Sequence, residues 1–360
     1  MDKVRAVIIF GTRPEAIKLF PLISELRNAP EFSITVVNTG QHDELTAEQS
    51  AVASFSSDVY LGVMRKGSSL TDLANRLQEG LSRALMALSP NFVVVQGDTA
   101  SAMFGALAAF HLGIPIAHVE AGLRTYDITS PYPEEGYRRI ISSVAFWNFC
   151  PSDHAAHNLH QERVGGSIHV TGNTIVDALQ LVLPHVENQS VKSPSEKLVL
   201  ATIHRRENVP FYPNIFSALR EIAEWENVRV VMTVHPNPNV QKATDVFLKN
   251  SAVELVSPMN YSSWISHMRQ ADLIISDSGG IQEEASILGV PLLVVRQNTE
   301  RPEVITGKYA YLCGVETDSI INFSWRVLQG EVLCTSGSPY GDGKAARRIF
   351  EILREYWEAS

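Results

Sequence analysis

Residues 4–18 read VRAVIIFGTRPEAIK: an apolar run stops at Gly11, and a polar turn with Pro14 leads into a helical pattern. From one end of the chain to the other, short apolar runs rich in valine and isoleucine alternate with longer amphipathic stretches. This alternation is typical of parallel β-strands whose sheet is covered by helices. The sequence therefore predicts an α/β fold.

The predicted strands lie in both halves of the chain. They are residues 4–10, 33–38, 91–96, 115–119, 197–202, 228–234, 253–256, 272–276 and 291–295. A chain of 360 residues is too long for one ordinary core and suits two domains. Because residues 187–196 are polar and contain a proline, we expect a hinge near 175–195. The first Rossmann-like domain would then be residues 1–175 and the second 176–344, followed by an amphipathic helix within 345–360.

The composition excludes several classes of protein. A net charge of -9 opposes the basic surface that nucleic-acid binding requires. No apolar run is long enough to span a bilayer, and the first residues lack a signal-peptide pattern, so we expect a cytoplasmic protein without a membrane partner. Cys150, Cys313 and Cys334 are too widely spaced to suggest disulfides or a thiolate metal site, and no metal is expected.

Charged side chains follow the predicted strands, at the edge where open parallel sheets bind ligands. Asp98, Glu120 and Glu134 are three carboxylates near this edge; candidate counter-charges are Arg13, Lys18, His204, Arg205, Arg206 and Arg301. One such carboxylate is often only a helix cap, and Asp98 lies where an N-cap would. The occurrence of three carboxylates together with a histidine favours a catalytic role over helix capping. We expect the two charged sheet edges to face one another across a cleft.

Ser278-Gly279-Gly280 opens a helix directly after a buried strand. The free N–H groups and the positive end of such a helix suit a phosphate, although a plain N-cap with a glycine turn is the alternative interpretation. Arg13 precedes a proline at another helix start and supplies a cation. The sequence contains neither Gly-x-Gly-x-x-Gly after the first strand nor a Walker motif, so no NAD or other cofactor is expected.

Eight segments together resemble the non-hydrolysing UDP-N-acetylglucosamine 2-epimerases, in the family's order. They are residues 10–18 (FGTRPEAIK), 97–99 (GDT), 118–125 (HVEAGLRT), 130–135 (SPYPEE), 204–207 (HRRE), 277–284 (DSGGIQEE), 300–303 (ERPE) and 339–343 (PYGDG). The resemblance implies the glycosyltransferase-B architecture, in which two Rossmann-like domains hold the nucleotide and the last helix packs back on the first. It also implies a homodimer whose ligands are UDP-N-acetylglucosamine and UDP.

The resemblance further assigns roles by motif. It implies that Arg13, Ser278, Gly279 and Gly280 bind the diphosphate. It also implies that Glu284 binds the ribose hydroxyls and that Trp264 stacks near the uracil. The positions that would line the sugar are Lys18, Asp98, Glu120, Glu134, Arg138, His204 and Arg301.

The position of the C2–H bond in the sugar limits the mechanisms by which C2 can be inverted. The C2–H of the substrate is not next to a carbonyl, so simple proton abstraction would leave a carbanion with no resonance sink. The resemblance implies anti elimination of UDP to 2-acetamidoglucal, followed by re-addition. We predict that Asp98, Glu120 and Glu134 handle protons and that His204 is also catalytic, and we leave open which carboxylate acts on which face of C2.

Other functions fit parts of the sequence. A UDP-sugar-dependent glycosyltransferase would share the fold and the nucleotide site. A silent UDP-sugar sensor would be expected to lack one of the catalytic residues, and a hydrolysing epimerase usually differs around His204. A related UDP-2-acetamido sugar is an alternative substrate, because Gln96 and residues 296–299 depart from the family pattern.

We predict that activation by a second substrate molecule is weakened in this protein. Relatives bind the activator partly through a Gln-His pair, which Gln41 and His42 match, but by motif their second glutamine becomes Glu44 and their arginine becomes Gly67. Losing one charge-assisted bond to a diphosphate costs about ten- to a hundredfold in affinity. The reverse reaction from UDP-N-acetylmannosamine should follow hyperbolic kinetics. A lag abolished by a trace of the gluco epimer would instead mean that residues 65–66 replace the lost arginine.

Overall fold

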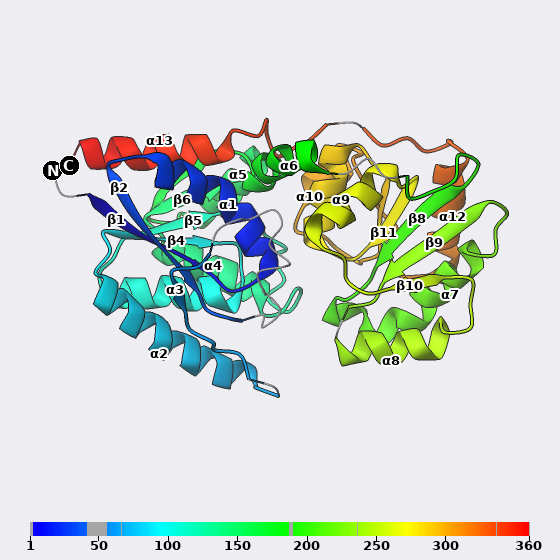
Figure 1. Ribbon diagram of the computed structural model, residues 1–360, viewed down its shortest axis with the longest axis horizontal. Helices are drawn as coiled ribbons and strands as arrows, with labels where there is room; N and C mark the ends of the chain where they lie inside the picture. Colours follow the sequence, from blue (N-terminus) through cyan, green and yellow to red (C-terminus); the bar gives the residue numbers. More distant parts are fainter. Residues whose placement is uncertain are drawn as a thin grey trace. The chain divides into compact units, whose positions relative to one another are not determined.

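The computed structural model describes residues 3–41, 56–65, 67–186, 190–235, 237–335 and 337–359. The chain forms two compact units, Met1–Leu181 with Tyr340–Ser360, and Val182–Pro339 (Figure 1). The predicted division at 175/176 falls inside helix α6 (Thr174–Val182), nearly all of which belongs to the first unit. The segment from Tyr340 also returns to this unit, because the Tyr340 carbonyl accepts the Asn173 N–H at 2.9 Å.

The first unit contains a seven-stranded sheet in the order β3-β2-β1-β4-β5-β6-β7, and its strand pairs are parallel. Its strands are β1 (Val4–Phe10), β2 (Phe32–Asn38), β3 (Val59–Tyr60), β4 (Phe92–Gln96), β5 (Ile116–Val119), β6 (Trp147–Cys150) and β7 (Ser167–Val170). Its helices besides α6 are α1 (Arg13–Asn28), α2 (Leu70–Leu88), α3 (Ala100–His111), α4 (Glu134–Val144), α5 (Asp153–Glu162) and α13 (Ala345–Glu358).

Two apolar cores lie on the two faces of this sheet. On one face Ile8, Phe92 and Phe149 pack with α1 and with the buried side of α13, including Ile349 and Leu353. On the other face Ile9, Val93 and Val95 pack with α2, α3 and α4. Helix α13 ends the chain but completes the first unit, and Figure 1 shows it running alongside α1.

The second unit contains a six-stranded parallel sheet in the order β10-β9-β8-β11-β12-β13. Its strands are β8 (Lys197–Thr202), β9 (Val228–Thr233), β10 (Glu254–Val256), β11 (Leu273–Ser276), β12 (Leu292–Val294) and β13 (Tyr311–Leu312). Its helices are η2 (Leu183–His185), η3 (Arg206–Phe211), α7 (Tyr212–Ile222), α8 (Pro238–Phe247), α9 (Tyr261–Gln270), α10 (Gly279–Leu288), α11 (Pro302–Thr306) and α12 (Thr317–Leu328).

The α/β class with two parallel-sheet domains is therefore confirmed. Every predicted strand is present, with ends that differ by at most one residue. The sequence missed β3, β6, β7 and β13, which are short: the first and last contain two residues each, and polar side chains interrupt Trp147–Cys150 and Ser167–Val170.

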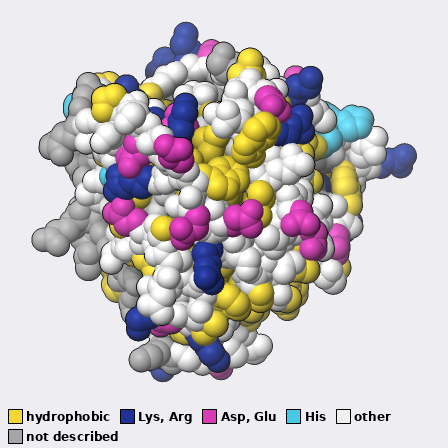
Figure 2. All heavy atoms as spheres, turned by 90° about the vertical axis from the view of Figure 1, so that its right-hand side faces the viewer, with side chains coloured by type: hydrophobic (Ala, Val, Ile, Leu, Met, Phe, Trp, Pro, Cys, Tyr) yellow, Lys and Arg dark blue, Asp and Glu magenta, His cyan; other side chains and the backbone are white. Residues whose placement is uncertain are grey.

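The distribution of surface charge and the length of the apolar helices indicate which kinds of partner the protein could bind. Figure 2 shows one face, on which acidic and basic side chains are interspersed around exposed hydrophobic ones, without a continuous basic stripe. In the described part of the chain, no helix is both long and apolar enough to cross a bilayer.

Candidate active site

Glu120 lies at the carboxyl edge of the first sheet, directly after β5. Its carboxylate is buried and receives a hydrogen bond from the Lys18 ammonium at 2.6 Å and another from the Gln96 side chain. The backbone at Glu120 has φ = 66°, a left-handed conformation that is uncommon for residues other than glycine. The turn therefore accepts local strain to direct this carboxylate toward α1 and β4.

Asp98 follows β4 after a left-handed Gly97 with φ = 68°. Its Oδ2 accepts Arg138 Nη1 at 2.8 Å, and its side chain is 31% exposed. The interpretation of Asp98 as an N-cap is wrong, because Thr99 is the N-cap of α3 and its side chain accepts the Ala102 N–H. The Asp98 carboxylate is thus available to pair with Arg138.

Arg138 is buried and connects Asp98 to the next loop. Its Nη2 lies 3.0 Å from Glu135 Oε2, and the same carboxylate accepts the backbone N–H groups of Thr125 and Tyr126. Glu135 thereby holds the segment between β5 and α4. Glu134, the neighbouring predicted catalytic residue, is the first residue of α4 and is half-buried.

Glu15 was not predicted as a site residue, yet it joins two turns of the site. Its carboxylate accepts the N–H groups of Gly11 and Thr12 at 3.0 and 2.8 Å and the Thr99 hydroxyl at 2.6 Å. Desolvation raises the pKa of Glu15 to about 7, although these hydrogen bonds oppose the shift. The Thr12-x-x-Glu15 capping box was the signal in the sequence that could have revealed it. Arg13 begins the helix that Glu15 caps.

Asp277 has the corresponding role in the second unit. Its buried carboxylate accepts the backbone N–H groups of His204 and Arg205 at 3.1 and 2.9 Å, and the Asn208 amide at 3.0 Å. The His204 ring stacks on His235 with centroids 5.1 Å apart. Desolvation lowers the pKa of His204 to about 4, against the opposing charge of Asp277, so the imidazole is neutral near pH 7.

Helix α10 begins with the predicted phosphate-binding residues, and Ser278 is its N-cap. A Cβ at Gly279 would lie 2.6 Å from Arg301 Nη1, whereas one at Gly280 would meet nothing within 4 Å. Arg301 is buried and donates to Glu283 at 2.7 Å and to Glu300. This arginine therefore braces the start of α10 through Glu283, a buried residue of the same helix.

The structure groups the predicted residues by unit. Arg13, Lys18, Asp98, Glu120, Glu134 and Arg138 lie on the turns and helix starts that follow β1, β4 and β5, while His204, Ser278, Gly279, Gly280 and Arg301 lie on those that follow β8, β11 and β12. Glu284 is buried in α10, and Trp264 is half-buried in the first turn of α9. The roles of all these residues stay predictions.

Of the two residues predicted to bind an activator, the structure describes Gln41 but not His42. The side-chain Oε1 of Gln41 accepts hydrogen bonds from the N–H and the hydroxyl of Ser101 at 2.9 and 2.7 Å, at the start of α3. This oxygen is therefore engaged with the protein itself. His42, together with Glu44, lies outside the described residues.

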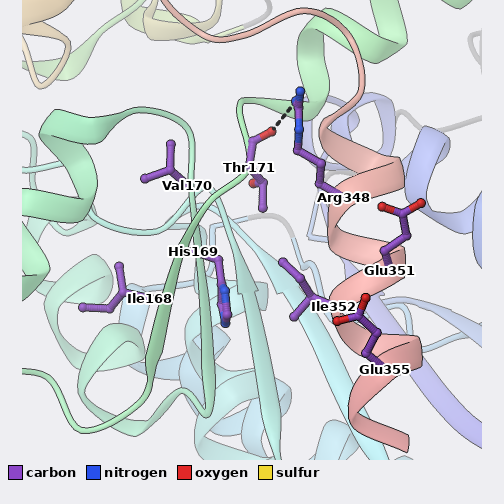
Figure 3. Close-up of a pocket in the computed structure, with 8 residues that line it drawn as sticks. All are labelled: Ile168, His169, Val170, Thr171, Arg348, Glu351, Ile352 and Glu355. Atoms are coloured by element: carbon purple, nitrogen blue, oxygen red, sulfur yellow. Dashed lines mark hydrogen bonds between the residues drawn. The ribbon is translucent and has the colours of Figure 1, made fainter. Parts of the chain in front are cut away.

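A separate pocket of about 430 Å³ lies in the first unit between β7 and α13 (Figure 3). Its lining residues are Ile168, His169, Val170, Thr171, Arg348, Glu351, Ile352 and Glu355, and none of the predicted site residues is among them. Within the described ranges, no group of three or more histidine, cysteine, aspartate or glutamate side chains could hold a metal ion.

A family model described as UDP-N-acetylglucosamine 2-epimerase matches residues 24–354. The chain belongs to the UDP-N-acetylglucosamine 2-epimerase family. It is 39% identical to the UDP-N-acetylglucosamine 2-epimerases of Salmonella typhimurium and Escherichia coli K12, over 98% of this chain and 99% and 98% of those proteins. The family identifies the protein as an isomerase.

Solved structures of this epimerase family have the same fold. The Neisseria meningitidis enzyme bound to UDP-GlcNAc has a TM-score of 0.91 at 36% identity, covering 98% of this chain and all of that one. The Methanocaldococcus jannaschii enzyme in complex with UDP-GlcNAc and UDP has a TM-score of 0.85 at 31% identity, covering 98% and 99%. MurG of Acinetobacter baumannii, at 13% identity and a TM-score of 0.54, shares the fold alone.

The packing around Gly279 leads to a stability prediction for this epimerase. Gly279→Ala should lower the free energy of unfolding by about 1–3 kcal/mol, because the added methyl group displaces the Arg301 guanidinium. Gly280→Ala is the matched control and should be neutral or stabilising by up to about 1 kcal/mol, since its Cβ is unopposed on a helix. Urea denaturation followed by circular dichroism measures the difference. Equal stabilities for the two variants would contradict the bracing role of Arg301.

Proposed function

We propose that this protein reversibly converts UDP-N-acetylglucosamine to UDP-N-acetylmannosamine without metal or NAD, as a non-hydrolysing epimerase. Family membership and the bound ligands named for the Neisseria meningitidis and Methanocaldococcus jannaschii structures support this substrate. The observation that carries the proposal is the placement of two carboxylates, Asp98 and Glu120, after adjacent strands β4 and β5. Each has its own cationic partner, Arg138 or Lys18.

The proposed reaction is elimination and re-addition. A base removes the C2 proton while the bond from C1 to the UDP oxygen breaks in the anti sense, which leaves 2-acetamidoglucal and UDP. UDP then adds back to C1 as a proton arrives on the opposite face of C2. This route avoids the unstabilised carbanion of a simple proton exchange, because the electrons of the C–H bond form the new double bond and expel the diphosphate.

Stabilising the departing diphosphate is the main electrostatic task. The free N–H groups of α10, with Ser278, Gly279 and Gly280, suit this charge. Arg13 would add a positive charge, and the neutral His204 would add a hydrogen bond. The N–H groups are fixed in place by the packing of α10, so they need no reorganisation as charge develops. We assign Glu284 to the ribose and Trp264 to the uracil, and Arg301 to the sugar side of the site.

Proton handling falls to Asp98, Glu120 and Glu134. Glu120 forms a buried ion pair with Lys18, and a proton transferred to this carboxylate would cancel its charge attraction to the ammonium. Asp98 is more exposed, and its Oδ2 accepts a hydrogen bond from Arg138 Nη1. The two carboxylates thus differ in environment, as the two directions of proton transfer require.

We also propose that the protein is a homodimer. Met86 of α2, Phe110 of α3 and Ile140 of α4 are 56%, 54% and 44% exposed. Their helices pack side by side on one face of the first sheet (Figure 1). Exposed apolar side chains on neighbouring helices favour burial against a second copy.

Solvent exchange at C2 tests the elimination. In deuterium oxide with EDTA and no added NAD, UDP-N-acetylglucosamine should gain deuterium at C2 as UDP-N-acetylmannosamine appears, because the abstracted proton mixes with solvent. Proton NMR measures the loss of the C2–H signal. Epimerisation with full retention of the original hydrogen would exclude this route, and transfer of the sugar to an acceptor would identify a glycosyltransferase.

Near-isosteric variants test the catalytic assignment. Asp98→Asn, Glu120→Gln, Glu134→Gln and His204→Asn should each lower kcat by about 10² or more, because each removes a proton-transfer or charge-stabilising group. Glu355→Gln, on the exposed side of α13, is the control and should leave kcat unchanged. Steady-state kinetics and melting temperatures are measured together. A near-normal kcat with a lowered melting temperature would assign the residue to folding instead.

A further inference from the structure

His118 is a buried imidazole beside the candidate active site that neither the motif assignments nor the proposed chemistry uses. It lies in β5, has no exposed surface, and its Nε2 is 2.8 Å from the carbonyl oxygen of Gly97. Its Nδ1 is buried and has no hydrogen-bond partner in the part of the chain that the structure describes. An apolar side chain would fill this space without an unsatisfied polar atom, so packing does not explain a histidine here.

The hydrogen bond fixes the tautomer of His118. A carbonyl oxygen can only accept, so Nε2 must carry a hydrogen, and in the neutral ring Nδ1 is then bare. Desolvation lowers the pKa of His118 to about 4, although the hydrogen bond to Gly97 opposes this shift. The charges of Arg124 and Arg138 lower the pKa further, and that of Asp98 raises it. The ring is consequently neutral at the pH values at which the enzyme would work.

The bond acts on the turn that carries Asp98. Gly97 has φ = 68°, and its N–H donates to the Val119 carbonyl at 2.9 Å while its own carbonyl accepts from His118. Both the backbone N–H and the backbone carbonyl of Gly97 are thus bound to β5. Arg138 fixes the Asp98 carboxylate from the other side, but it reaches the side chain and leaves the backbone unconstrained.

We propose that His118 is a positioning residue that holds the Gly97 turn, and through it the Asp98 carboxylate, in the geometry needed for proton transfer at C2. The inference rests on the proposed function, since it assigns Asp98 to that transfer. Proton transfer requires a base within hydrogen-bond reach of the reacting atom, and a misplacement of about 1 Å can cost about 10²-fold in rate. A neutral donor suits this place because it holds the backbone without adding a second cation near Asp98, which already pairs with Arg138.

Two substitutions separate the hydrogen bond from the volume of the ring. In His118→Gln the amide nitrogen reaches approximately the position of Nε2 and can still donate to Gly97. In His118→Asn the shorter amide matches Nδ1 and cannot reach it. We expect His118→Asn to lower kcat by about ten- to a hundredfold with KM changed less than about threefold, and His118→Gln to recover most of that loss. His169→Asn, in the edge strand β7, is the control histidine and should leave both constants unchanged.

Equal losses in the Gln and Asn variants, or a loss expressed mainly in KM, would overturn the positioning role. Solvent exchange at C2 by the wild type is measured alongside, so a failure of the proposed epimerisation is seen separately. NMR provides a readout without turnover: the ¹⁵N spectrum of the wild type should show hydrogen on Nε2 of His118, and the ¹³C carboxyl signal of Asp98 should shift in His118→Asn. Hydrogen on Nδ1, or an unchanged Asp98 signal, would overturn the inference whether or not the variant is active.

Discussion

Buried carboxylates bind the backbone N–H groups of the turns that follow the parallel strands, and the geometry of the candidate site depends on them. Glu15 holds Gly11 and Thr12 in the first unit, and Asp277 holds His204 and Arg205 in the second. A turn at the carboxyl edge of a sheet leaves N–H groups that no strand or helix can satisfy, and burial without a partner would be unfavourable. A carboxylate meets several of these donors at once, so the turn acquires one conformation.

Burial of Glu15 has an electrostatic cost, because it disfavours the charged carboxylate. Glu15 has its pKa raised from 4.5 to about 7, so between these values the folded protein holds a proton that the unfolded chain has released. Its contribution to stability is therefore complete below about pH 4.5 and declines as the pH rises toward 7. Glu15 also accepts hydrogen bonds from the hydroxyls of Thr12 and Thr99. A change in its protonation state therefore affects the turn after β1 and the turn after β4.

Buried ion pairs hold the charged side chains of the candidate site, as the buried carboxylates hold the backbone of the turns. Lys18 pairs with Glu120, Arg138 with Asp98 and Glu135, and Arg301 with Glu283 and Glu300. Such pairs seldom stabilise a fold more than apolar residues of similar size would, because each charge must be desolvated. Their concentration at the carboxyl edges of two sheets is more readily explained by the need to hold charged side chains ready for an anionic substrate.

The sequence by itself determined the α/β class, because runs such as Val4–Phe10 and Val228–Thr233 are mostly apolar and rich in β-branched residues. It also identified the polar residues after these strands, since parallel strands bring their carboxyl ends to one edge whatever the details of packing. It did not reveal β6 and β7, whose four-residue segments gain their strand structure from neighbours in the sheet. Nor could it separate Asp98 from the true N-cap, Thr99, assign Glu135 and His118, or show that Glu15, beyond its capping box with Thr12, also binds Thr99. Their partners are up to 84 residues distant in the chain, as Thr99 is from Glu15, and only the tertiary structure brings these donors and acceptors within hydrogen-bond distance.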